Sequence, residues 1–230
     1  MRKTKIVTSE DILLKLCQSV TAVLTKATDS QVHHSAMVQK ISKTSLKPDI
    51  GCFVLFDGGF SGLVVINFEA KAAMEVYQKY MSHMGIPKEE LATLHTSDEV
   101  SDVLGELMNQ IVGDFTGKVK RSLQTNITQN QPKMMAINKN INVTVDSNIE
   151  RPQARRVSFS TEDNHIFYLE LSMERTEFIQ LEEFEEGDDL NPDDILEAAI
   201  AKNLEEPKDG RKSKHPKATE ADSLMDDLGI

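Results

Sequence analysis

The sequence predicts an α+β domain over residues 1–180, in which an antiparallel β-sheet packs with long helices, and an acidic tail over residues 181–230. Two observations predict this fold class. Segments with helical and strand-like patterns follow one another in the order helix, three strands, two helices, three strands. The strands are joined by connections of hairpin length, which favours antiparallel pairing over a parallel βαβ sheet. Because each side has a helix and three strands, we expect two pseudo-symmetric halves, although their sequences do not visibly match.

The first half begins with a helix and continues with strands. Thr8 or Ser9 provides a helix cap. Apolar residues then recur at helical spacing, namely Ile12, Leu13, Leu16, Val20, Val23 and Leu24. Three strand-like segments follow between residues 32 and 67, written "HHSAMVQKIS", "IGCFVLF" and "SGLVVINF". The last two are joined by "DGG" at residues 57–59, which predicts a β-hairpin.

The second half repeats this pattern after an additional helix. That helix, "EAKAAMEVYQKYMSHMG", is expected to end near Gly85, with Pro87 just beyond it. A long third helix is predicted from about Thr96 to Leu123. Three strands are predicted after it, "NKNINVTVDS", "QARRVSFST" and "HIFYLELSM", separated by turns rich in Asn, Asp and Pro.

Composition excludes several classes of protein. The chain is 39% hydrophobic, enough for a sizeable core, yet apolar runs such as "LVVI" at 63–66 fall far short of the roughly 20 residues that cross a bilayer. We expect no membrane association, and a cytoplasmic protein, because the N-terminus lacks an apolar stretch of signal-peptide length. Cys17 and Cys52 have no CxxC neighbour, so we expect buried thiols and neither a metal site nor a disulfide.

The negative charge is concentrated in the tail. Residues 181–230 contain 16 acidic and 6 basic residues, whereas residues 1–180 contain 21 acidic and 20 basic residues. A near-neutral domain without a basic stripe gives little drive toward nucleic acid, so no nucleic-acid partner is expected. The tail cannot bury enough apolar surface to fold as a domain, and we expect it to be flexible, with a short helix over residues 192–204.

The third helix has an unusual polar face. At 100° per residue, Asp102, Glu106, Asn109 and Gly113 lie within about 60° of one another. The other side is apolar and contains Val103, Leu104, Leu107, Met108, Ile111, Val112 and Phe115. A glycine inside a helix costs about 1 kcal/mol relative to alanine, which suggests that another protein approaches closely at Gly113. The spacing alone also fits an ordinary solvated helix face.

The segment "DVLGELMNQIVGDFTGKVKRSL" resembles the signature helix of the CheC/CheX chemotaxis phosphatases, whose pattern is D/S-x-x-x-E-x-x-N. Asp102, Glu106 and Asn109 match this pattern completely. Further residues resemble the CheX branch in particular: Gly105, Leu107, Ile111, Gly113 and Lys118. Outside this helix the likeness is in the order of elements over about residues 8–175. The resemblance implies a CheC/CheX-like fold and removal of the phosphoryl group from the phospho-aspartate of a CheY-type response regulator.

The resemblance also implies a role for each residue. Asn109 would orient the attacking water and Glu106 would pair with a lysine of the regulator, while Asp102 and Gly113 would support them. The regulator supplies magnesium, so no cofactor of the chain's own is expected. CheC proteins carry two such motifs, but the first helix here has Lys15 in place of the glutamate, between Asp11 and Gln18. A single site is therefore implied, as in CheX-like proteins, whose strand-paired homodimers imply a homodimer here.

Two questions stay open at the level of sequence. A non-catalytic scaffold or adaptor with the same fold would bind the same regulator, and only an assay separates it from a phosphatase. The C-terminal "EADSLMDDLGI" resembles the tether by which CheZ, an unrelated phosphatase, binds CheY, although a disordered end fits equally well. The residues expected to dock are Leu224, Met225, Leu228 and Ile230, within residues 219–230.

Overall fold

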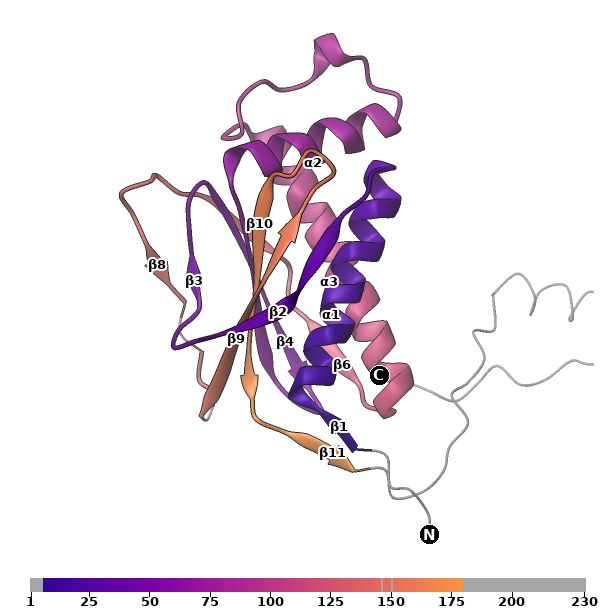
Figure 1. The fold of residues 1–230 in the computed structure, drawn as a ribbon, viewed down its shortest axis with the longest axis vertical. Coiled ribbons are helices and arrows are strands. Elements are labelled where there is room, and N and C mark those ends of the chain that lie inside the picture. The colour runs from indigo at the N-terminus through magenta and orange to yellow at the C-terminus, as the bar shows by residue number, and fades with distance from the viewer. Residues whose placement is uncertain (1–5, 146, 150, 180–230) are drawn as a thin grey trace, which may run out of the picture. The chain divides into compact units, whose positions relative to one another are not determined.

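The computed structural model describes residues 6–145, 147–149 and 151–179 (Figure 1). The first part of the chain contains β1 (Ile6–Thr8), α1 (Ser9–Thr28), β2 (His33–Ile41), β3 (Ser45–Leu46), β4 (Ile50–Gly58), β5 (Gly62–Phe68) and α2 (Ala70–His83). The second part contains the 3-10 helix η1 (Lys88–Glu90), α3 (Asp98–Leu123), β6 (Ile127–Gln129), β7 (Lys133–Ala136), β8 (Val143–Thr144), β9 (Pro152–Ser160), β10 (Ile166–Glu174) and β11 (Glu177–Ile179). The tail expected at 181–230, with its short helix and docking residues, lies outside the described residues.

The predicted α+β class with an antiparallel sheet is confirmed. The main sheet has the order β2-β9-β10-β5-β4-β6, and β7 also pairs with β4. Every pairing in it is antiparallel. The hairpin predicted at residues 57–59 joins β4 to β5, with Phe56 opposite Gly62. The strand predicted over "NKNINVTVDS" is shorter in the structure: among its described residues only Val143–Thr144 form a strand, because its many Asn side chains favour turns.

The two expected halves exchange strands. The first half runs α1, β2, β3, β4, β5, and the second runs α3, β7, β8, β9, β10. The hairpins β4–β5 and β9–β10 meet at the centre through β5 and β10. The first strand of each half pairs with the hairpin of the other: β2 with β9, and β7 with β4. The short strands β3 and β8 pair with each other in the same way. Neither half can therefore complete its own sheet.

Helices cover one face of the sheet and the β3–β8 pair covers part of the other (Figure 1). Strand β5 shows the effect of having both faces covered, because all seven of its residues are buried. Val64, Ile66 and Phe68 belong to the main core under α1, α2 and α3. Leu63 and Val65 face a smaller cluster with Leu46 and Ile137. A strand buried on both sides reads as a continuous apolar run, as "LVVI" does.

Local signals account for the helix ends. Thr8 and Asp11 form a capping box at the start of α1, in which each side chain accepts a hydrogen bond from the other residue's backbone N–H. At the start of α3, the Ser97 side chain accepts from the Val100 N–H. Gly85, two residues after α2, has φ +84°, a backbone conformation that glycine adopts readily. These features explain why the three predicted helices are confirmed nearly at their predicted bounds.

In the part of the chain that the structure describes, no helix is long and apolar enough to cross a membrane. Both cysteines are buried free thiols, as predicted. Burial raises the pKa of Cys17 to about 12 and raises that of Cys52 as well, so both are protonated and unreactive at neutral pH.

Candidate functional site

The polar face of α3 points outward. Asp102, Glu106, Asn109 and Gly113 are all exposed. On the other side of the helix, Leu104, Leu107, Met108, Ile111, Val112 and Phe115 are buried against the core, and Val103 is half-buried. The sheet and the other helices therefore leave the Glu106 and Asn109 side chains accessible to an incoming protein.

Glu106 is steadied by its own helix. The Gln110 Nε2 donates a hydrogen bond of 3.1 Å to Glu106 Oε1 from one turn further along α3. Residues four apart on a helix lie on the same face, so this contact follows directly from the sequence spacing. The second carboxylate oxygen, Oε2, is left to face solvent or a cationic partner. The site thus presents a carboxylate that an ammonium or guanidinium group can pair with.

Asn109 is held from outside its helix. The Gln129 Nε2, at the end of β6, lies 3.0 Å from Asn109 Oδ1 and 3.4 Å from the Asn109 backbone oxygen. An asparagine amide has one acceptor oxygen and one NH₂ donor group. With the oxygen held by Gln129, the NH₂ group keeps both of its protons for another partner. The amide is therefore a fixed donor on an open surface.

The space beside Gly113 is open. A methyl group built on its Cα meets no atom of the chain within 4 Å. Packing within the chain therefore does not require a glycine here, and the helix loses stability by having one. Gly117, one turn later, also has room, since the nearest atom is Arg121 Nη1 at 4.0 Å. Beyond Asn109, α3 thus has two positions with room for a methyl group, and the Arg121 side chain lies beside the second.

A hollow of about 450 Å³ lies between the three helices next to this face. Gln110 and Asp114 line it from α3, and Tyr80 lines it from α2. Most of its remaining lining is apolar or small: Ala22, Val23, Ala27 and Met84. Met84 is 62% exposed, so an apolar surface is open to solvent within reach of the Glu106–Gln110 pair. An apolar hollow rimmed by polar groups is typical of a protein-binding surface.

Lys118 does not join the site. Its Nζ lies 2.6 Å from Asp114 and 3.2 Å from the Ser19 Oγ of α1. Burial raises the pKa of Asp114, but hydrogen bonds from Lys118 and Ser19 outweigh this effect and bring the pKa below its usual value. Lys118, although it matches the CheX pattern, therefore links α3 to α1 through its ion pair with Asp114 and its hydrogen bond to Ser19.

The equivalent face of α1 carries different side chains. Asp11 is engaged in the capping box with Thr8, and its hydrogen bonds from Thr8 lower its pKa. Lys15 occupies the position of the glutamate, and Gln18 is exposed. Lys15 therefore gives this face of α1 a positive charge where α3 has the carboxylate of Glu106.

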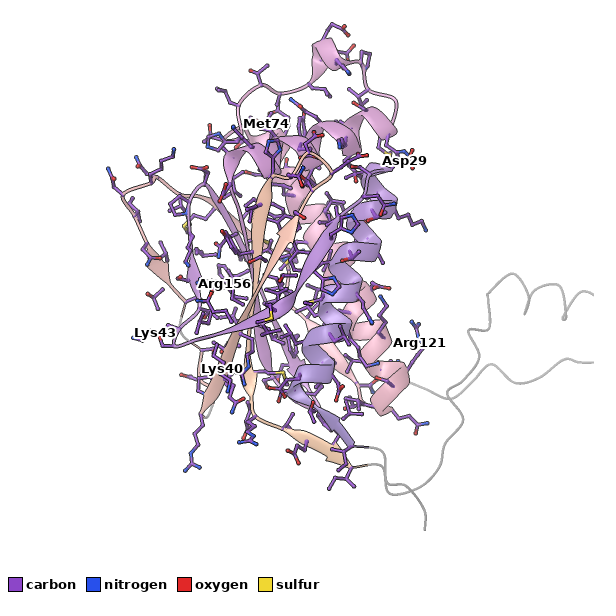
Figure 2. The ribbon with its side chains drawn as sticks, viewed as in Figure 1. Asp29, Lys40, Lys43, Met74, Arg121 and Arg156 are labelled. Atoms are coloured by element: carbon purple, nitrogen blue, oxygen red, sulfur yellow. The ribbon has the colours of Figure 1, made fainter. Side chains whose placement is uncertain are left out.

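A second polar cluster lies at the C-terminal end of α1. Ligand-type atoms of Glu75, Asp163 and His165 lie within 4.8 Å of one another. These residues line a hollow of about 990 Å³ together with Asp29 and Met74. Figure 2 labels Asp29, which follows α1, and Met74 of α2.

The carboxylate of Glu75 in this cluster is already satisfied. It accepts from His165 Nδ1 at 2.8 Å and from the hydroxyl of Thr161, and the Lys79 Nζ lies 2.9 Å away. Because an ammonium group already stands against Glu75, we interpret this cluster as a structural tie between α2 and the β9–β10 turn rather than a metal site.

Solved structures show which class of fold this is. The chain is similar to a chemotaxis protein CheX from Desulfovibrio desulfuricans (TM-score 0.58, 16% identity, covering 71% of this chain and 99% of that one). It is similar to a CheC-like superfamily protein from Shewanella sp. PV-4 (TM-score 0.58, 19% identity, covering 71% of this chain and 97% of that one). It is also similar to CheX in a CheX–CheY–BeF3–Mg²⁺ complex from Borrelia burgdorferi (TM-score 0.54, 17% identity, covering 71% of this chain and 97% of that one). The fold is therefore CheC/CheX-like.

Within that class, the chain belongs to the family described as "Protein of unknown function (DUF3334)", whose model matches residues 3–230. A comparison with curated proteins found no match. The match to DUF3334 includes the acidic tail as well as the folded domain.

Two residues of the site were not anticipated from the sequence. Gln110 could have been, because an amide four residues after Glu106 is a recognised helix pairing. Gln129 could not, because it lies 20 residues beyond Asn109 in a three-residue strand that the hydrophobic pattern did not predict. Only the pairing of β6 with β4 brings it to the helix.

Proposed function

We propose that this protein removes the phosphoryl group from the phospho-aspartate of a CheY-type response regulator, using Glu106 and Asn109. The observation that supports the proposal most is the exposure of these two side chains on one face of α3, beside an open glycine, in a CheC/CheX-like fold. The Borrelia CheX was crystallised with CheY, BeF3 and Mg²⁺, which makes a response regulator the natural partner to test.

The proposed chemistry asks little of the phosphatase. A water oxygen attacks the phosphorus, the bond from phosphorus to the aspartyl oxygen breaks, and inorganic phosphate and a free carboxylate result. Magnesium and a lysine of the regulator would neutralise the charge on the transferring group. The phosphatase must then position the water and the two surfaces.

Each of the two side chains would have one task. The NH₂ group of Asn109 would donate a hydrogen bond to the oxygen of the attacking water. The Oδ1 atom already accepts one hydrogen bond from Gln129, and its second lone pair would accept a hydrogen bond from the same water. Glu106, steadied by Gln110, would form an ion pair with the regulator's lysine and fix the docking register. Asp102 would add negative charge at the rim of the site, and Gly113 would let the regulator's backbone approach α3.

The experiment is an assay of phosphate release from a regulator charged with acetyl phosphate. We expect the wild-type protein to accelerate release, and we expect Glu106→Ala and Asn109→Ala each to lose most of that acceleration. Gln18→Ala is the matched control, because Gln18 takes the place of the asparagine on α1 and should be dispensable. If the wild-type protein binds the phosphorylated regulator but does not accelerate the regulator's spontaneous dephosphorylation, the protein is a scaffold and the phosphatase proposal fails.

Self-association stays a prediction. In the described sheet β2 is an edge strand, with main-chain groups on one side that no described strand pairs with. Met37, in this strand, is 79% exposed. Exposed edges of this kind are where a second copy of a chain can add a strand. Sedimentation of the wild-type protein and of a Met37→Lys variant would test whether a dimer forms through β2.

A further inference from the structure

We infer that Gln129 is a positioning residue that fixes the orientation of the Asn109 carboxamide before any partner arrives. Its consequence for catalysis rests on the proposed function, whereas the orientation itself can be measured in the free protein. The inference starts from one contact: the Gln129 Nε2 lies between two acceptors of the same residue, Asn109 Oδ1 at 3.0 Å and the Asn109 backbone oxygen at 3.4 Å.

The backbone oxygen determines which end of each amide faces the other. It belongs to α3 and cannot rotate away, so only the NH₂ end of Gln129 is compatible with it. With that NH₂ group in place, an Asn109 turned the other way would bring two donor groups together. Asn109 must therefore keep Oδ1 toward Gln129 and its NH₂ group away from it. Without Gln129, rotation about the Asn109 χ2 angle would exchange the two ends freely.

The support for this contact is rigid. Gln129 ends β6, and its backbone pairs with Phe56 of β4 in the main sheet. The ring of Phe56 is in turn buried against Phe115 of α3, with ring centroids 5.5 Å apart. Sheet, strand and helix are thus packed together at this point, so Gln129 does not need to be ordered when a partner binds. Preordering of this kind removes an entropic cost from the reacting complex.

The Nε2 end of Gln129 ties β6 to the backbone of α3, but the fold gives no reason for its other end. The Oε1 atom of Gln129 is buried and has no hydrogen-bond partner in the described structure. A buried acceptor without a partner lowers the free energy of unfolding. An apolar side chain of similar length would avoid that loss. The residue therefore gives up stability while its other end holds Asn109, a pattern expected of a side chain kept for function.

The first test is the variant Gln129→Met, which keeps the volume and removes both the donor and the unpaired acceptor. We expect its free energy of unfolding to equal or exceed that of wild type, and its affinity for a beryllofluoride-treated regulator to stay unchanged. We expect its rate of phosphate release to fall by about tenfold to a hundredfold. The control is Gln131→Met, an exposed glutamine two residues later. An unchanged rate in Gln129→Met, or a fall in rate explained by lost stability, would overturn the inference.

The second test does not depend on activity. Relaxation of the Asn109 side-chain amide, measured by NMR in the free protein, should show a restricted NH₂ group in wild type. In Gln129→Met it should become as mobile as that of Asn130, which is exposed. If the Asn109 amide is equally mobile in both proteins, Gln129 does not position it. If it is restricted but no regulator is dephosphorylated, the proposed function fails while the positioning role stands.

Discussion

Replacing Gly113 with alanine tests the docking face through two quantities that should move in opposite directions. The residue is well inside the 26-residue helix α3, where alanine is favoured over glycine by about 0.8–1.0 kcal/mol. Its new methyl group would meet no atom of the chain within 4 Å, so nothing offsets this gain. For a domain of this size, a gain of about 1 kcal/mol raises Tm by about 2–4 °C. Thermal unfolding followed by circular dichroism would measure it.

Binding of the regulator should respond in the opposite way. If a partner's backbone rests on Gly113, the added methyl group would have to be accommodated at a packed contact, at a cost of about 1–3 kcal/mol. The Kd for a beryllofluoride-treated regulator should then rise roughly fivefold to 150-fold. The matched variant Gly117→Ala should give a similar gain in Tm, because it also has room for a methyl group, with a smaller loss of affinity.

Two results would refute this reasoning. A lower Tm for Gly113→Ala would mean that part of the chain covers this face of α3. A higher Tm with unchanged affinity would mean that no partner approaches closely at Gly113, and that the site faces elsewhere.

Three further predictions concern other parts of the chain. Glu170 is fully buried 2.7 Å from Arg156, but without that arginine it keeps Lys47 at 3.9 Å and a hydrogen bond from the Ser45 N–H. Arg156→Met should therefore lower the free energy of unfolding by about 1.5–3 kcal/mol in urea denaturation, and Arg155→Met, at a partly exposed pair, by under about 1 kcal/mol. Burial raises the pKa of Glu75, but hydrogen bonds from its neighbours outweigh this effect and bring the pKa below the ordinary 4.5. The contribution of Glu75 to stability is therefore complete above pH 4.5 and is lost as pH falls through the lowered pKa. Unfolding of wild type and Glu75→Gln at pH 3–7 should show that loss only in wild type. Removal of residues 219–230 should weaken regulator binding in calorimetry while leaving the Tm unchanged, and equal affinity after truncation would reject the tether.

Local signals in the sequence were sufficient for the helices and hairpins. The cap at Thr8 lies within three residues of its partner Asp11, and the "DGG" turn fixes the β4–β5 hairpin on its own. The helical period of α3 was enough to place Glu106 and Asn109 on the exposed side. Each of these inferences depends on residues that are close together in the chain.

Pairings between distant segments could not be predicted in this way. The exchange of β2 and β7 between the halves depends on which hairpin offers a free edge, and β2 alone could have paired with its own half. β1 and β11 are three-residue strands that pair with each other from opposite ends of the described chain. The contact of Gln129 with Asn109 belongs to this group, because β6 is too short to carry a period of its own.

The rate at which Asn109→Ala dephosphorylates a regulator that it still binds is the most direct test of the proposed site. Single-turnover release of phosphate should be measured at saturating Asn109→Ala protein, after its Kd for the beryllofluoride-treated regulator has been determined. We expect a Kd close to that of wild type and a rate lower by about a hundredfold, because the amide would act on the water and not on docking. A rate equal to that of wild type would show that the exposed amide of α3 has no part in the reaction.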